Sequence, residues 1–383
     1  MPKKRWVVAL SIGVIAATTP PALSKTPNCL FHGQVRNIAG QKSSCVYVNG
    51  ETFWISYKKR AENKLSAYEK TKLKAYNQIK NAAGNSITNM QLRYEISKYF
   101  PAPLKVEYIR QTEQAAKLYD QFFTRPVVVN NYFQTEKDAA FIKSHPVLKR
   151  DSESFDSWFK AWEAGKDLDH NSGLAAWFFN SGGKSEAHSG VVLGSKTSKA
   201  RLGLYSQQVV AHELFHTVQD FYKQPRDLKG YESMAEFDKY YPPVFREGSA
   251  NTISTAVAME SFEDYLLFYQ TFLTQKKDQY APKIFTRINS VPNTVELLKE
   301  MSVREGGDQD VHEASYSMGS LLFEWVIAEY GFDGYKKLVQ NQIVGNSFED
   351  NVKTSLGLTL DQLYKAAAPH ILAGFAAAKG STR

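Results

Sequence analysis

The sequence has little cysteine and, beyond its first residues, no long hydrophobic run. Only two of its 383 residues are cysteine, Cys29 and Cys45, which is too few for a four-cysteine zinc site. No later segment approaches the about 20 consecutive apolar residues that a membrane-spanning helix needs. Zinc knuckle, RNP-like and helix-turn-helix patterns are also absent. We therefore expect neither a nucleic-acid partner nor a transmembrane segment in the mature chain.

The N-terminal segment has the features of a secretory signal peptide. Three basic residues, 3–5, precede an apolar run at 6–17, and small residues follow as far as Ser24. This pattern predicts cleavage near Ser24 and export to a periplasmic or extracellular compartment. In that oxidising setting an even cysteine count favours a disulfide between Cys29 and Cys45, with zinc ligation by the pair as the alternative.

Basic residues concentrate between Lys58 and Lys80, in a run that includes Lys72. Glu62 and Glu69 dilute the charge within it. Such a pattern is typical of a solvated helix face, and binding to an anionic surface or substrate is the alternative. The net charge is +8, and without the three basic residues of the N-terminal segment it is 8 − 3 = +5, which is mild for this length.

The motif with the most chemical content is the H-E-x-x-H run at 212–216, inside a stretch, 206–222, that reads as helix. Apolar residues recur through this stretch, and no proline or glycine interrupts it. Residues four apart on a helix lie on one face, so His212 and His216 can direct two imidazole nitrogens at one ion while Glu213 reaches its coordination sphere. The alternative is that both histidines are ordinary core residues. A third ligand decides between the two readings.

Glu247 is the best candidate for that third ligand. Pro242 and Pro243 end the preceding segment, and the run from Glu247 through Met259 predicts a new helix with the carboxylate in its first turn. Small residues after Glu247 would let this helix approach the first one closely. Asn251, one turn on, could hydrogen-bond a ligating histidine. The alternative for Glu247 is a surface carboxylate favoured by the helix dipole.

H-E-x-x-H followed about thirty residues later by E-G-x-A resembles the gluzincin superfamily of zinc metallopeptidases, in the branch with that second motif rather than the thermolysin type proper. The third histidine that metzincins place after the first motif is absent. The resemblance implies one zinc ion held by His212, His216 and Glu247, with Glu213 as the base that activates the zinc-bound water. Where the thermolysin type has an aspartate one turn after its ligand, this chain has Asn251.

The resemblance extends into the last third of the chain and covers roughly residues 191–372, about half of the sequence. Residues 316–325 and the Tyr-Gly step at 330–331 are similar to the helix of such peptidases that begins near the active site. Residues 347–363 are similar to their closing helical repeat. These segments predict that the C-terminal part of the chain is helical and contributes to the site.

The resemblance also implies a mechanism. Two neutral imidazoles and one carboxylate leave Zn²⁺ with a positive charge, which lowers the pKa of bound water toward about 7. Glu213 then accepts the proton of the attacking water and delivers it to the leaving amine. A hydrogen-bond donor for the oxyanion is expected, and Tyr316 or His312 could supply it. A tyrosine at the start of an apolar helix is more often a packing residue, and this is the alternative for Tyr316.

The order of predicted elements indicates an α+β fold. We expect a sheet-containing lobe that carries the H-E-x-x-H helix, then a mainly helical lobe, with zinc in the cleft between them. A hairpin is predicted at 44–57 around an Asn-Gly turn, followed by lysine-rich helix to about Tyr99. Further predicted elements are helices near 112–123 and 152–164, strands at 127–129, 175–179 and 191–193, and helices from 231 onward. In gluzincins an edge strand near the metal pairs with the substrate backbone, and either of the last two strands could take that place.

These patterns divide the chain into four predicted segments. They are a signal peptide at 1–24, an N-terminal region at 25–100, a mixed α/β lobe at 101–222 and a helical lobe at 223–383 that supplies the third ligand. The expected function is that of an exported zinc metallopeptidase acting on a peptide or protein, with a cell-wall peptide or other small peptide as an alternative substrate. The alternative function is a non-catalytic, zinc-bearing envelope or cell-surface binding protein. Glu213 favours the enzyme, because a decayed site would be expected to lose its base first.

Overall fold

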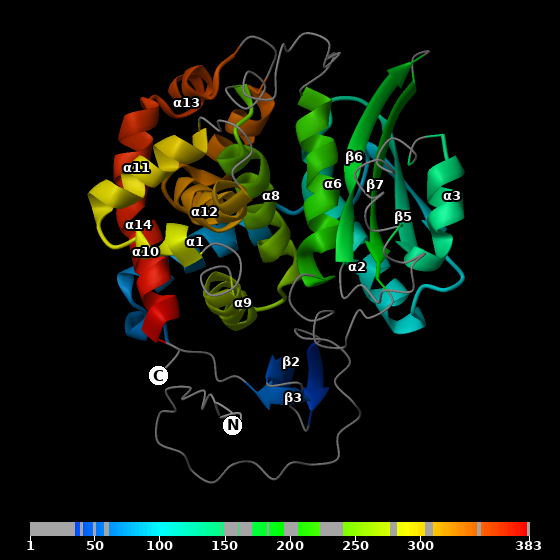
Figure 1. Ribbon diagram of the computed structural model, residues 1–383, viewed down its shortest axis with the longest axis horizontal. Coiled ribbons are helices and arrows are strands. Elements are labelled where there is room, and N and C mark those ends of the chain that lie inside the picture. The colour runs from blue at the N-terminus through cyan, green and yellow to red at the C-terminus, as the bar shows by residue number, and fades with distance from the viewer. Residues whose placement is uncertain are drawn as a thin grey trace.

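The chain folds as a mixed α and β protein with mostly helical content (Figure 1). The computed structural model describes residues 35–38, 41–48, 51–56, 61–146, 148, 160, 171–181, 184–194, 206–222, 240–275, 282–302, 309–342 and 346–380. Within these ranges no helix is both long enough and apolar enough to cross a membrane. The predicted signal peptide and Cys29 lie outside the described residues.

A small antiparallel sheet comes first in the chain. Its strands, in the order β1-β2-β3, are β1 (Val35–Ile38), β2 (Gln41–Val48) and β3 (Glu51–Ser56). The predicted hairpin at 44–57 is confirmed in β2 and β3, where Cys45 pairs with Trp54 across the two strands. Cys45 therefore lies within β2.

A second sheet has four strands in the order β4-β5-β7-β6. They are β4 (Met90–Ile96), β5 (Val127–Thr135), β7 (Lys184–Leu193) and β6 (Asn171–Ser181). β4, β5 and β7 run parallel, and β6 is antiparallel to β7. The strands predicted at 127–129, 175–179 and 191–193 fall within β5, β6 and β7. Of the two candidates for the edge strand, β6 is terminal in this described sheet and β7 is interior.

β4 corrects one sequence-based prediction. Helix was expected to continue to about Tyr99, but α1 (Ala67–Ala82) ends well before β4 begins. Met90, Leu92, Tyr94 and Ile96 alternate with polar residues at the two-residue period of a strand, and the inward positions are the less exposed ones. The interspersed charges hid this alternation within a generally polar, lysine-rich region.

Among the helices, α6 (Ser206–Tyr222) carries the H-E-x-x-H run and lies beside the four-stranded sheet (Figure 1). The others are α2 (Ala102–Tyr119), α3 (Ala139–Ser144), α8 (Pro243–Ala258), α9 (Phe262–Gln275), α10 (Pro282–Thr286), α11 (Val291–Ser302), α12 (Gln309–Gln340), α13 (Phe348–Leu356) and α14 (Leu360–Gly380). Short 3₁₀ turns lie at Glu62–Lys64, Asp120–Phe122 and Glu136–Asp138. The helix predicted near 112–123 is the second half of α2, and the one near 152–164 falls almost wholly outside the described residues.

α6 is buried between the sheet and the C-terminal helices. It contacts β6, β7 and α2 on one side and α8 on the other. From residue 208 to 222 none of its side chains is exposed. One hydrophobic core reaches from the sheet through Phe215 of α6 to α8, α12 and α14. A helix so enclosed holds its side chains in fixed positions, which a metal site requires.

α8 and α12 cross at a backbone-to-backbone contact between Gly248 and Gly319. A methyl group added at Gly319 would lie 2.4 Å from the carbonyl oxygen of Val244 and 2.8 Å from Cα of Gly248. A methyl group added at Gly248 would lie 2.4 Å from Cα of Gly319. Only glycine at both positions allows this approach, since the atoms met are backbone atoms that cannot rotate away. The small residues after Glu247 thus pack against α12, in addition to any role toward α6.

Substitution Gly319→Ala should lower the free energy of unfolding by about 3 kcal/mol, because the new methyl group forces α8 and α12 apart. Gly374→Ala is the matched control, since Gly374 is also within a helix but its added methyl would meet the ends of the Leu321 and Tyr68 side chains. Those ends can rotate, so the control should stay within about 1 kcal/mol of wild type. Urea unfolding measures both, and equal losses would contradict the proposed backbone contact.

Lys72 is the second correction to the sequence-based prediction. It was expected on a solvated face, but its side chain is buried, and Nζ donates a 2.7 Å hydrogen bond to Oε2 of Glu324 on α12. Tyr265 donates to the other oxygen of Glu324, and His370 lies 3.4 Å from Oε2. Burial lowers the pKa of Lys72 to about 8, although the Glu324 charge opposes this. The Tyr269 ring, 3.4 Å from Nζ, provides a further favourable contact for the cation.

Lys72→Met should destabilise the fold by about 3–5 kcal/mol, because it leaves the buried Glu324 carboxylate without its main partner. Lys74→Met, two positions along the same helix, is the control. Lys74 lies 3.8 Å from Glu329, and both side chains are about half exposed, so its loss should cost at most about 1 kcal/mol. Thermal and urea unfolding compare the two variants. A Lys72→Met protein as stable as Lys74→Met would show that the buried pair contributes nothing.

Candidate metal centre

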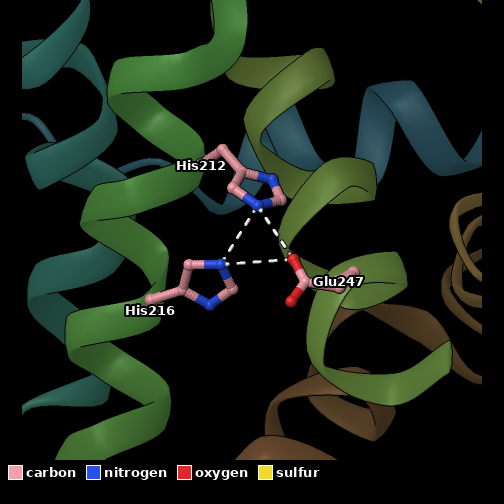
Figure 2. Close-up of side chains that lie close together, drawn as sticks. All are labelled: His212, His216 and Glu247. Atoms are coloured by element: carbon pink, nitrogen blue, oxygen red, sulfur yellow. Dashed lines mark hydrogen bonds and ion pairs between the residues drawn. The ribbon is translucent and has the colours of Figure 1, made fainter. Parts of the chain in front are cut away.

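The two histidines of the H-E-x-x-H run and the downstream glutamate meet between α6 and α8. His212 and His216 lie one turn apart on α6 and point across to Glu247 on α8 (Figure 2). The Nε2 atoms of the two rings are 3.0 Å apart. Oε2 of Glu247 lies 3.3 Å from Nε2 of His212 and 3.5 Å from Nε2 of His216. Three atoms that can bind a metal ion thus converge from two helices.

Their spacing fits a metal ion. A tetrahedral zinc site with bonds of about 2.0–2.1 Å separates its ligand atoms by roughly 3.3–3.4 Å. The separations of 3.0, 3.3 and 3.5 Å surround that value. His212 and Glu247 are buried, and His216 is partly buried. The group formed by His212, His216 and Glu247 therefore has the donor atoms and the geometry to hold a metal ion.

The three groups also have strongly shifted pKa values. Burial alone would raise the pKa of Glu247, but hydrogen bonds from His212 and His216 and the charges of His216 and Arg246 hold it well below its usual range. Burial opposes the charged form of His216 as well, yet the contact with Glu247 raises the pKa of His216 to about 9. For His212 burial wins, and its pKa is lowered. Without a metal ion, one imidazolium and one neutral ring therefore face an ionised carboxylate at neutral pH.

Glu247 lies in the second turn of α8 rather than the first. α8 begins at Pro243, because proline at the first helical position already has the required backbone angle and lacks an N–H group that would be unsatisfied there. The predicted start at Glu247 is therefore wrong by about one turn. Arg246 donates a 2.9 Å hydrogen bond from Nε to Oε1 of Glu247, and Oε2 faces the histidines.

Asn251 lies beside the site, one turn after Glu247 as the sequence suggested. Its Oδ1 accepts a 3.0 Å hydrogen bond from Gln208 of α6, and its Nδ2 donates to the carbonyl oxygen of Tyr316 at 3.2 Å. It is close enough to His212 to favour the charged ring slightly. Nδ1 of His212, however, makes no hydrogen bond of ordinary length with the described residues. Asn251 mainly connects three helices around the site.

The other predicted site residues gather at the same place. Glu213 is partly buried, and its charge raises the pKa of both His216 and Tyr316. The Tyr316 ring stacks on the His212 ring, with centroids 5.9 Å apart and planes at 26°. His312, one turn earlier on α12, contacts Tyr316 edge-on at 5.3 Å. α12 therefore brings both candidate donors to the ligand cluster.

Gln219 is a site residue that the sequence reasoning missed. Its Oε1 lies 2.6 Å from Nδ1 of His216, the ring nitrogen that faces away from His212 and Glu247. The only sequence signal is its position three residues after His216, on the same face of the helix. A glutamine at that spacing is common on helices for many reasons, so the pattern alone could not identify it.

Comparison of the chain with models of known protein families, with curated proteins and with solved structures gave no significant match.

Zinc binding to metal-free protein should release about one proton per ion at pH 7, because zinc binds the neutral ring and the raised pKa of His216, about 9, keeps that ring protonated. His212, with a lowered pKa, is already neutral and should contribute little. Affinity should rise with pH up to about 9 and then level off. Calorimetry in two buffers of different ionisation enthalpy counts the protons. The same titration at pH 10 is the control, and undiminished release there would contradict the assignment to His216.

Proposed function

We propose that the protein is an exported zinc metallopeptidase of gluzincin type. The observation that carries this proposal is the convergence of His212 and His216 with Glu247 at separations of 3.0 to 3.5 Å. Two histidines and one glutamate form a donor set of hydrolytic zinc sites, in which a fourth position stays open for water or substrate. Glu213, next to His212 in the sequence and partly buried, supports an enzyme over a non-catalytic zinc protein.

Glu213 is the proposed general base. A zinc ion bound at this site would supply a Lewis acid that polarises the scissile carbonyl and brings the pKa of a water molecule to about 7. Glu213 takes the proton of the attacking water and later gives it to the leaving amine. The carbonyl carbon gains the hydroxyl, the C–N bond breaks and the amine gains the proton, so no covalent bond to the protein forms.

Tyr316 is the stronger candidate for the donor to the oxyanion. Its ring lies against His212, and burial, with the charges of Glu247 and Glu213, raises its pKa well above the usual value. The hydroxyl therefore keeps its proton at neutral pH and can donate it to a developing negative oxygen. His312, which contacts Tyr316, is the second candidate.

The substrate is proposed to be a peptide or protein bound in extended form along β6. β6 ends the described four-stranded sheet and packs against α6, the helix that carries two of the ligands. A peptide that adds to such a strand gains main-chain hydrogen bonds whatever its sequence. In this proposal the zinc lies between a sheet-containing lobe and a helical lobe.

Export and a stabilising disulfide complete the proposal. They rest on the basic and apolar pattern of residues 1–24 and on the pair Cys29 and Cys45. Metal and cleavage chemistry do not depend on either, so they can be tested on protein that begins after Ser24.

Glu213→Gln should retain one zinc per chain and lower the cleavage of an unstructured protein such as casein by roughly 10²- to 10⁴-fold, because it removes the base but no ligand. Glu247→Ala should lose zinc as well as activity. Glu329→Gln, at an exposed position on α12, controls for the change of glutamate to glutamine and should behave as wild type. Elemental analysis and a casein assay, with and without a chelator, measure both properties.

Each outcome has a separate meaning. Full activity of Glu213→Gln would refute the mechanism. One zinc in wild type without cleavage of any peptide would instead indicate a binding protein. Absence of zinc from wild-type protein would indicate that His212 and His216 are ordinary core residues.

A further inference from the structure

We propose that Gln219 is a positioning residue that holds the His216 ring with Nε2 directed at the metal. This inference rests on the proposed function, since it assigns a role to a residue next to the proposed zinc ligand. Gln219 is 1% exposed and lies on α6, one turn after His216. Its side chain contacts both a ligand and the backbone beside another ligand, which no other described glutamine does.

The orientation of the Gln219 amide is fixed by its partners. Its Nε2 lies 2.9 Å from the carbonyl oxygen of Arg246 and 2.8 Å from Oγ of Ser249, both on α8. A carbonyl oxygen only accepts hydrogen bonds, so the nitrogen of the amide must face Arg246. The oxygen of the amide, Oε1, must therefore face His216.

That orientation decides the proton on the His216 ring. Oε1 of Gln219 cannot donate a hydrogen bond, so Nδ1 of His216, 2.6 Å away, must carry a proton. In the neutral ring the lone pair then belongs to Nε2, the atom that faces His212 and Glu247. The acceptor on Nδ1 thus selects the form of His216 that can bind a metal through Nε2.

The chain of contacts also links two ligands across the helix interface. The carbonyl that orients Gln219 belongs to Arg246, the residue directly before Glu247. Ser249, the second acceptor, is fully buried, and its own carbonyl oxygen accepts a 3.1 Å hydrogen bond from Tyr335 of α12. A shift of the Glu247 backbone would therefore move Gln219 and tilt His216. Gln219 thus couples the position of His216 on α6 to that of Glu247 on α8.

His212 is held in a different way. Its Nδ1 makes no hydrogen bond of ordinary length with the described residues, and its ring is instead stacked on Tyr316. The two ligating rings are thus not equivalent: packing orients His212, whereas a hydrogen bond orients His216. Loss of the acceptor should therefore affect His216 specifically.

Two substitutions separate positioning from a merely structural role. Gln219→Met keeps the length of the side chain but removes both the acceptor for His216 and the donor to α8. Gln219→Glu keeps an acceptor for His216 but loses the donor to Arg246 and Ser249. Gln342→Met is the matched control, because Gln342 is equally buried, donates to the carbonyl oxygen of Tyr240 and accepts from Asn351, and touches none of the ligands.

The measurements are the zinc dissociation constant, from competition with a chelator, and the thermal unfolding of each metal-free variant. We expect Gln219→Met to bind zinc roughly 10- to 100-fold more weakly. Gln219→Glu should bind zinc at least as tightly as wild type although it unfolds more easily. Gln342→Met should lose stability without losing zinc affinity.

The results distinguish this inference from the proposed function. Wild-type zinc affinity in Gln219→Met, or equal weakening in Gln219→Met and Gln219→Glu, would overturn the positioning role and leave the zinc site intact. A wild-type protein that binds no zinc would overturn the proposed function and this inference together. Zinc affinity that follows stability across all three variants would reduce Gln219 to a structural contact.

Discussion

The backbone contact between Gly248 and Gly319 sets how closely α8 and α12 approach, and the arrangement of the site depends on it. Glu247 directly precedes the first glycine, and Tyr316 lies one turn before the second. Thr252 reinforces the same crossing, because its hydroxyl donates to the carbonyl oxygen of Ser320 at 2.8 Å. A wider separation of the two helices would move the Tyr316 ring away from His212. The position of α12 beside the candidate ligands therefore depends on glycine at both 248 and 319.

The interface between α6 and α8 is polar where most buried helix interfaces are apolar. Gln208 donates to Asn251 and accepts from Ser254 and Thr255, all within 3.0 Å. Gln219, further along α6, donates to Arg246 and Ser249 of α8. Hydrogen bonds from Gln208 and Gln219 to α8 thus lie on either side of the candidate ligands along α6. Buried polar groups are costly unless they are satisfied, so they fix one register between the two helices. The register that satisfies them is also the one that brings Glu247 opposite the histidines.

Elements with a strong local pattern could be predicted from the sequence. Features that depend on contacts between distant parts of the chain could not. The helical period located α6, and the H-E-x-x-H spacing located the two candidate metal ligands on it, because both are local properties. The start of α8 was missed since proline can either end a segment or begin a helix. In the sequence Lys72 has the same context as its exposed lysine neighbours. Its burial is explained by Glu324, which lies 252 positions later in the chain. Gln219 has a role that depends on a carbonyl group from another helix, which no pattern records.

The buried pair of Lys72 and Glu324 has a consequence for how the chain reaches its fold. The two residues are separated by 252 positions, and α1 also contributes Ala75 and Ile79 to the central core. Until α12 has been synthesised, the inner face of α1 has neither its counter-ion nor most of its apolar neighbours. Contacts of such long range slow folding, because the long intervening chain must be closed before they form. A chain that ended before α12 would therefore leave Lys72 without Glu324 and much of the inner face of α1 uncovered.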